Sequence, residues 1–312
     1  MPGLFRRSAS AVSDGARKRI AALKPYPTLD MWRNPVTRGF ARRLQNEDAR
    51  RLLNEIDFDF RITTDSAGAI DGVSYETENS TGGAPLILFV HGGGFVAGGP
   101  HDNAASVLPT CFLSGCNGFG PDYSLLPEAN YPVQVDEISA AYHGLRLAHP
   151  GSRIIVFAES TGAAIALSAM MQWRDEGAPL PIGAVFVSPC VDGMGASDTQ
   201  ISLAGRDPVI RSSRGAYIRN LFRFYAPGRA LDDPDVSPLY GDFTGLPPML
   251  THAGGREVLL GDAARLTQAA NRAGIDARLQ VFDGMYHRFH AHWSLEEARD
   301  AHRDIAEFIM TL

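Results

Sequence analysis

The sequence predicts an α/β protein, with a mostly parallel central sheet, helices on both faces and a helical cap. From about residue 85 onward, short runs of β-branched and aromatic residues alternate with apolar residues at helical spacing, a pattern typical of a parallel sheet. Residues 85–90 and 154–157 are continuously apolar, as expected for strands buried on both faces. Residues 191–245 interrupt the pattern, which predicts an inserted lid over a pocket.

Composition and charge narrow the class of protein. The chain has 312 residues, 45% of them hydrophobic, and a net charge of −6. The acidic balance argues against nucleic acid as the main partner, and no apolar run reaches the length of a membrane span. Residues 1–24 are basic but lack the apolar centre of a secretory signal. We therefore expect a solvated arm, with a transit peptide as the weaker alternative, and a cytoplasmic protein.

The three cysteines, Cys111, Cys116 and Cys190, are odd in number and show no metal-ligand spacing. We expect free thiols in a reducing compartment. A disulfide between Cys111 and Cys116 is the alternative.

Residues 1–60 are expected to form an N-terminal arm and a helical cap segment. Residues 35–56 carry apolar side chains at helical spacing, beginning with Val36, Phe40 and Leu44. The opposite face carries five arginines: Arg38, Arg42, Arg43, Arg50 and Arg51. We interpret the arginine face as solvated, with contact to an anionic partner as the alternative.

The α/β core is expected in two parts, residues 61–190 and 246–312, with a second cap segment at 191–245 between them. Strand-like segments occur at 58–62, 72–75, 85–90, 115–121, 154–157, 184–187, 248–253 and 277–282. Helical patterns occur at 135–145, 164–171, 212–225 and 295–310.

A glycine triplet follows the strand at 85–90 directly, in the stretch His91-Gly92-Gly93-Gly94-Phe95. Without Cβ atoms, the backbone N–H groups of such a loop can point into one space. That arrangement suits the stabilisation of an oxyanion. A flexible turn is the alternative, but the flanking His91 and Phe95 favour the oxyanion interpretation. Neither phosphate-loop pattern is present.

Residues 154–163 run from a strand through Ser160 into a helical pattern, as in a nucleophile elbow. The sharp turn needs small residues two positions on either side of the serine, here Ala158 and Gly162. The usual pattern has glycine at the first of these positions, so Ala158 is a departure. A helix cap is the alternative role for Ser160.

Glu257 and His287 each follow a later predicted strand, so the chain order is Ser160, Glu257, His287. Because the carboxyl ends of parallel strands meet at one edge of a sheet, this order predicts a Ser-His-Glu triad. Asp262 competes as the acid, but its place inside the following helix favours capping or helix-surface duty. The spacing of His287, His290 and His292 also invites a metal site; the triad explains His287 better, and we expect His290 and His292 at the rim or in packing.

These motifs resemble those of the hormone-sensitive-lipase family (bacterial family IV) of α/β-hydrolase-fold esterases, over roughly residues 25–312. The stretch 91–95 matches the family's HGGG motif, 122–128 (DYSLLPE) is similar to DYRLAPE, and 158–163 (AESTGA) is similar to GDSAGG. Further similar landmarks lie at 207–209, 237–240, 245–248, 257–262 and 284–289. The chain departs from the family at Ser124, Leu126 and Ala158.

The resemblance implies Ser160 as nucleophile, His287 as general base and Glu257 as the acid that orients His287. It implies an oxyanion hole formed by backbone N–H groups, with a histidine and a glycine supporting the loop: Gly93, Gly94 and Thr161, supported by His91 and Gly92. The implied activity is hydrolysis of short-to-medium acyl esters through an acyl-enzyme, without a metal or organic cofactor. Four aromatic residues are expected in the substrate pocket, with packing of the lid as the alternative for the lid aromatics: Phe95, Tyr217, Phe222 and Tyr286.

Two other functions stay open. One is a lactonase or another specialised ester hydrolase that uses the same triad. The other is a small-ligand binding protein, as in the gibberellin receptors, which resemble this family but lack the catalytic histidine. The presence of His287 favours the enzyme. The sequence does not determine the natural substrate, the acyl-chain length or the oligomeric state, and a homodimer stays open.

Overall fold

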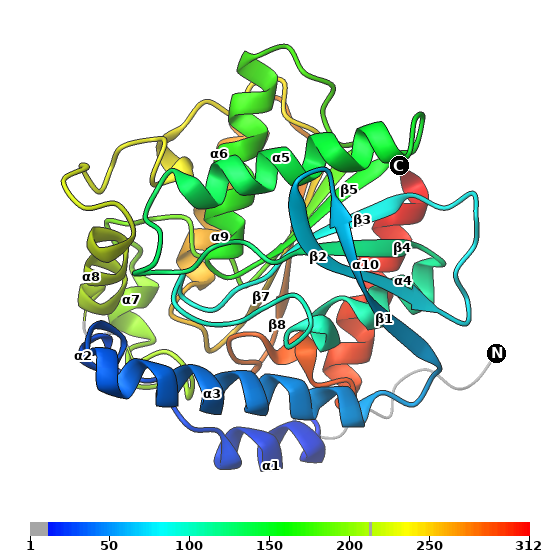
Figure 1. The fold of residues 1–312 in the computed structure, drawn as a ribbon. Coiled ribbons are helices and arrows are strands. Elements are labelled where there is room, and N and C mark those ends of the chain that lie inside the picture. Colours follow the sequence, from blue (N-terminus) through cyan, green and yellow to red (C-terminus); the bar gives the residue numbers. More distant parts are fainter. Residues whose placement is uncertain (1–11, 212–213) are drawn as a thin grey trace.

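An eight-stranded sheet forms the centre of the residues that the computed structural model describes, 12–211 and 214–312 (Figure 1). The strands are β1 (Phe60–Ala67), β2 (Ile70–Thr77), β3 (Leu86–Val90), β4 (Asn117–Pro121), β5 (Ile154–Glu159), β6 (Gly183–Val187), β7 (Met249–Gly254) and β8 (Ala277–Phe282). Their order is β1-β2-β4-β3-β5-β6-β7-β8, and β2 is antiparallel to both neighbours. The six strands β4, β3, β5, β6, β7 and β8 pair in parallel, so their carboxyl ends meet at one edge, as the sequence predicts.

Successive side chains of the central strands enter two different cores. In β3, Leu88 and Val90 belong to the larger core, whereas Ile87 and Phe89 belong to the smaller core on the opposite face. The larger core includes residues of α5 (Val133–Ala148), α6 (Gly162–Asp175) and α9 (Leu260–Arg272), and the smaller one includes residues of α4 (Leu108–Ser114) and α10 (Glu296–Thr311). Burial on both faces explains why the strand is apolar at every position.

The cap combines the N-terminal helices with the insertion between β6 and β7. Its N-terminal part holds α1 (Asp14–Ala22), α2 (Leu29–Arg33), α3 (Pro35–Arg51) and the 3₁₀ helix η1 (Leu52–Glu55). The insertion holds α7 (Thr199–Ser202), α8 (Ala216–Tyr225) and η3 (Pro238–Tyr240). Helix α2 contacts α8 (Figure 1), so two segments far apart in the sequence lie against each other. Two further 3₁₀ turns are η2 (Ala104–Ser106) and η4 (Phe289–Ala291).

The face that α3 turns toward the protein is not the apolar face that its amphipathic pattern predicts. The expectation of a solvated arginine face is wrong for Arg42, whose Nε donates to the Val96 carbonyl at 2.6 Å and whose Nη2 donates to Glu128 at 2.7 Å. The apolar stripe is exposed instead: 85% for Val36, 53% for Phe40 and 45% for Leu44. The physical reason is that the core surface below α3 presents carbonyl oxygens and a carboxylate, which an arginine satisfies and an apolar side chain cannot.

The edge hairpin formed by β1 and β2 is longer than the sequence predicts. β1 and β2 pair along their full lengths, whereas the sequence suggests only short strands at 58–62 and 72–75. Nearly all of β1 is exposed, so its residues lack the apolar alternation that marks a half-buried strand.

Several other expectations bear on the described residues. Cys111, Cys116 and Cys190 are buried free thiols, as expected. Within the ranges that the structure describes, no helix is long and apolar enough to cross a membrane. Residues 1–11 of the expected arm and residues 212–213 of the expected lid helix lie outside the described residues; the lid helix is observed as α8.

Candidate active site

The serine turn between β5 and α6 is tightly packed against the glycine loop. Ser160 has φ = +53°, an uncommon conformation for a residue with a side chain. A Cβ on Gly162 would lie 2.3 Å from the Val90 carbonyl oxygen and 2.4 Å from that of His91. A Cβ on Gly92 would lie 2.8 Å from Cβ of Ser160. Only glycine fits at these two positions, whereas Ala158 is accommodated in the larger core.

Ser160, Glu257 and His287 come together at the carboxyl edge of the sheet. Nε2 of His287 lies 3.1 Å from Oγ of Ser160, and its Nδ1 lies 3.1 Å from Oε2 of Glu257. All three side chains are buried. Because the carboxylate faces Nδ1, the imidazole proton belongs on Nδ1, which leaves Nε2 free to accept the serine proton.

Ser188 binds the carboxylate of Glu257, and the sequence analysis did not single it out. Its hydroxyl donates to Oε1 of Glu257 at 2.8 Å, and Oγ of Ser188 in turn accepts the backbone N–H of Arg288 at 3.1 Å. The Gly254 N–H also donates to Oε1 of Glu257. Ser188 directly follows β6, so its position after a buried strand was the available signal.

Asp207 ties the start of the lid to the loop that carries Glu257. Its carboxylate accepts N–H groups from Val209 at 2.9 Å, Ile210 at 3.1 Å and Val258 at 3.2 Å. Burial raises the pKa of Asp207. The landmark at 207–209 therefore has a structural role beside the site.

The glycine loop is held by His91 and Tyr123. Nδ1 of His91 lies 2.7 Å from the Gly92 carbonyl, and its ring stacks on Tyr123 at 4.3 Å between centroids. The Tyr123 hydroxyl donates to the His91 carbonyl at 2.7 Å. Burial lowers the pKa of His91 to about 4, so the ring is neutral near pH 7 and donates from Nδ1 to Gly92.

The side chain of Thr161 enters the predicted oxyanion hole. Gly93 and Gly94 both have positive φ, +129° and +66°. The N–H of Gly94 donates to Oγ1 of Thr161 at 3.0 Å, so one of the three predicted donors is paired with a hydroxyl. Sequence analysis considered only the backbone of Thr161. The signal was the threonine itself, at a position where the family pattern has alanine.

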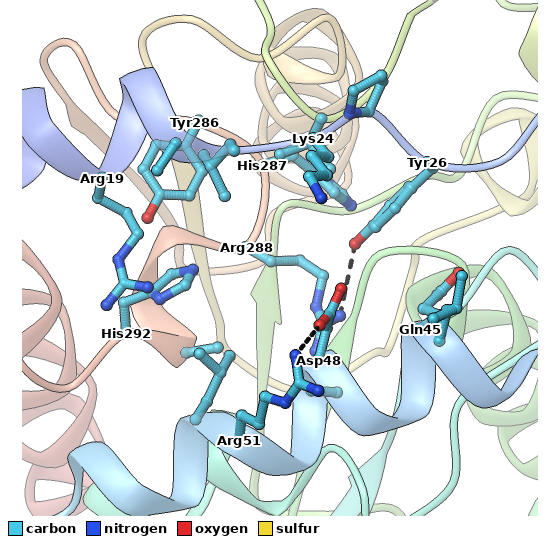
Figure 2. Close-up of a pocket in the computed structure, with 18 of the residues that line it drawn as sticks. Arg19, Lys24, Tyr26, Gln45, Asp48, Arg51, Tyr286, His287, Arg288 and His292 are labelled. Carbon is cyan, nitrogen blue, oxygen red and sulfur yellow. Dashed lines mark hydrogen bonds and ion pairs between the residues drawn. The ribbon is translucent and has the colours of Figure 1, made fainter. Parts of the chain in front are cut away.

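A cavity of about 520 Å³ lies beside His287, between the N-terminal cap and the loop after β8 (Figure 2). Tyr286 lines this cavity, as do Tyr26 and Arg288. Phe95, Tyr217 and Phe222 are not among its lining residues. Phe95 and Phe222 are fully buried and pack edge to face at 5.4 Å, as in the packing alternative, and Tyr217 is half-buried against the larger core.

Tyr26 brings the N-terminal arm to the site and was missed in the sequence. Its ring packs edge-on against His287 at 6.1 Å between centroids. Figure 2 shows Tyr26 directed toward Arg288, whose Nη1 lies 3.4 Å from the phenol oxygen. An aromatic residue between two prolines, Pro25 and Pro27, was the only sequence hint.

The remaining acidic and histidine candidates are buried: Asp262 and His290 are packed in the interior, and His292 also lines the cavity beside His287, as expected for a rim or packing residue. Asp262 accepts the N–H groups of Val191 and Asp192 and the Ser197 hydroxyl, the last at 2.7 Å. Helix-surface duty is therefore a wrong expectation for Asp262, because the loop after β6 folds over its carboxylate. His290 lies 3.2 Å from Glu159, and His292 lies 3.6 Å from Glu55. In the described residues, no group of three or more His, Cys, Asp or Glu side chains is arranged to hold a metal ion.

Comparison with known proteins gives a consistent result. The family defined by the alpha/beta hydrolase fold matches residues 87–291. An acetyl-hydrolase of Streptomyces hygroscopicus is 33% identical over 72% of this chain and 75% of its own length. An esterase of Acinetobacter venetianus is 30% identical over 73% of this chain and 75% of its own.

Solved structures extend the similarity over nearly the whole chain. An esterase from the bacterial hormone-sensitive lipase family has a TM-score of 0.82 and 29% identity, and covers 95% of both chains. This chain belongs to that family of α/β-hydrolase-fold esterases. A hormone-sensitive lipase from a metagenome library is also similar to this esterase, with a TM-score of 0.81 and 26% identity over 97% of this chain and 99% of its own. The resemblance predicted from the motifs is confirmed, and the protein is a carboxylic-ester hydrolase.

Proposed function

We propose that this esterase hydrolyses short-to-medium acyl esters by a Ser160–His287–Glu257 triad through an acyl-enzyme. The observation that carries the proposal is the pair of 3.1 Å contacts that His287 makes with Ser160 and Glu257. A short acyl group is supported by similarity to an acetyl-hydrolase, 33% identical to this chain.

Acylation begins when Nε2 of His287 takes the proton of Ser160. The serine oxygen attacks the ester carbonyl, and the carbonyl electron pair moves to the oxygen to give a tetrahedral oxyanion. We assign the stabilisation of that oxyanion to the N–H groups of Gly93 and Thr161 and to the Thr161 hydroxyl, which accepts the Gly94 N–H. When the bond to the alcohol oxygen breaks, the imidazolium returns its proton to the leaving alcohol.

Deacylation repeats the sequence with water. His287 removes a proton from water as the hydroxide attacks the acyl carbonyl, and the proton then passes to Ser160 as the acid leaves. Glu257 keeps the imidazole in one orientation and stabilises its charged form. Because the alcohol departs next to Nε2, the cavity beside His287 is the proposed exit for the alcohol.

The test is a substrate series with purified protein. We expect p-nitrophenyl acetate and butyrate to be hydrolysed faster than long-chain esters, and Ser160→Ala to be inert toward all of them. A set of lactones measured alongside distinguishes the lactonase alternative, which would show higher kcat/KM on the ring substrates. Wild-type protein as inert as Ser160→Ala, yet stabilised against heat by a small ligand, would favour the binding-protein alternative instead.

A further inference from the structure

Two charged residues that take no part in the proton path flank the catalytic serine and histidine. Glu159 directly precedes Ser160, and Arg288 directly follows His287. Oε1 of Glu159 lies 2.5 Å from Nε of Arg288, and the carboxylate is completely buried. Arg288 has φ = +63°, an uncommon conformation for a residue with a side chain.

Glu159 directly precedes the serine turn, and its carboxylate also packs against the glycine loop. A Cβ on Gly92 would lie 2.9 Å from Oε1 of Glu159, so the carboxylate sits against the glycine loop. Its second oxygen lies 3.2 Å from Nε2 of His290. Burial opposes the charge, but Arg288 and His290 outweigh it and hold the pKa of Glu159 well below its usual range.

The arginine side of the pair reaches three other segments. Its Nη1 lies 3.4 Å from the Tyr26 hydroxyl on the N-terminal arm, and its Nη2 lies 3.3 Å from Oγ of Ser106 in η2. Its backbone N–H donates to Ser188, which in turn donates to Glu257. Figure 2 shows the Arg288 side chain directed toward Tyr26 beneath the arm.

The sheet alone does not set the distance between the serine and the histidine. Ser160 follows β5 and His287 lies after β8, and the strands β6 and β7 separate these two in the sheet. No backbone ladder joins β5 to β8 directly. The Glu159–Arg288 ion pair is a direct link between the two loops, one residue away from each reacting side chain.

We propose that Glu159 and Arg288 form a positioning pair that sets the spacing of Ser160 and His287 and fixes the arm on His287 through Tyr26. The inference rests on the proposed roles of Ser160 and His287. The pair acts through these residues and makes no contact with the reacting bond. Its loss therefore slows the chemical step more than it weakens substrate binding.

The test compares Glu159→Gln, Arg288→Met and the double variant, which contains neither charge. Each single variant leaves one buried charge without its partner. We expect kcat on p-nitrophenyl butyrate to fall by about 10²-fold in each single variant, the size of effect that a misplacement of about 1 Å produces, with KM changed less than about threefold. The double variant should lose less than the product of the two single effects, and Arg288→Lys should keep part of the activity.

The pH profile separates positioning from a general loss of structure. In Glu159→Gln the positive charge of Arg288 is uncompensated beside the imidazole, so the acidic limb of kcat/KM should move to lower pH. In Arg288→Met the negative charge of Glu159 is uncompensated, and the limb should move to higher pH. Glu257 and Asp207 also interact with His287, and these variants leave both in place.

Controls keep the outcomes distinct. Arg303→Met removes an exposed arginine paired with Asp300 on α10 and should leave kcat unchanged. If folded Arg288→Met keeps the wild-type rates and an unmoved acidic limb while Ser160→Ala is inert, the positioning pair is overturned and the proposed function stands. Ser160→Ala as active as wild type would overturn the proposed function, and the positioning pair with it. Circular dichroism and active-site titration with an organophosphonate count the folded sites in each variant.

Discussion

Nε2 of His287 lies 3.1 Å from Oγ of Ser160, although 127 residues separate the two in the chain. The same ring places Nδ1 against Glu257, so one imidazole faces both a proton donor and a buried carboxylate. From this geometry we predict how much activity is lost when each of the three residues is replaced.

Removing the serine or the histidine should abolish nearly all activity. For Ser160→Ala and His287→Ala we expect kcat to fall by roughly four to six orders of magnitude, and for Glu257→Gln by a smaller factor, because the acid acts only through the imidazole. Initial rates on p-nitrophenyl acetate measure the loss, with far-ultraviolet circular dichroism as the check on folding. A Ser160→Ala variant with more than about 1% of the wild-type rate would contradict the assignment.

The Thr161 hydroxyl should contribute to the rate. It accepts the Gly94 N–H, and its own hydrogen has no acceptor among the described residues, so it can point at a developing oxyanion. Thr161→Val places a methyl group against that N–H, and we expect about a tenfold or greater fall in kcat. Thr161→Ser should stay close to wild type. A Thr161→Ala variant faster than wild type would show instead that the hydroxyl competes with substrate for Gly94.

A methyl group added at Gly162 should not fit between the serine turn and the glycine loop. In Gly162→Ala the new Cβ would meet the carbonyl oxygens of Val90 and His91 at 2.3 and 2.4 Å, and neither backbone can move without displacing β3 or the loop. We expect a lower Tm and at least a tenfold lower kcat. Gly39→Ala is the matched control: nothing lies within 4 Å of its Cβ in the interior of α3, so it should stabilise the protein by about 1 kcal/mol. Equal Tm values for the two variants would refute the packing argument.

The buried carboxyl of Asp262 should make stability depend on pH. Burial, followed by the charge of Asp192, raises its pKa from 3.8 to about 7. Because the folded pKa is the higher one, the stabilising contribution is complete below the unfolded value and is lost as pH rises through the folded value. Asp262→Asn lacks this titration; its one amide oxygen can accept the two N–H groups that Oδ2 of Asp262 accepts, and its NH2 group can donate to the Ser197 hydroxyl.

Thermal unfolding at about pH 5 and about pH 8 measures the difference. The Tm of Asp262→Asn should rise relative to wild type as the pH increases between these values. Asp300→Asn, which removes an exposed carboxylate on α10, should show no such trend. A constant difference between Asp262→Asn and wild type at both pH values would contradict the assigned shift.

Much of the fold could be predicted because local chemistry constrains it. β3 is apolar throughout and β5 is apolar up to its last residue, Glu159, since both faces of these strands are buried. The glycines at 92 and 162 mark places where another segment of the chain approaches too closely for a side chain. The edge strand β1 was harder to delimit because it is almost entirely exposed, so its residues are not selected for an apolar alternation.

The orientation of α3 could not be predicted from its own pattern. The three apolar residues at four-residue spacing are exposed, and Arg42 turns inward. That choice depends on Val96, Leu126 and Glu128, which present oxygen atoms to the helix from a distant part of the chain. A pattern within one helix carries no information about the surface that the helix meets.

The sequence by itself determined the fold class, the chain order of the candidate site residues at the ends of the strands and the residue types of the site, because backbone strain and burial act on neighbouring residues. Only the tertiary structure decided that Ser188 holds Glu257, that Tyr26 packs on His287 and that Glu159 pairs with Arg288. These contacts join loops from different strands, and their energy depends on distances that no local pattern encodes.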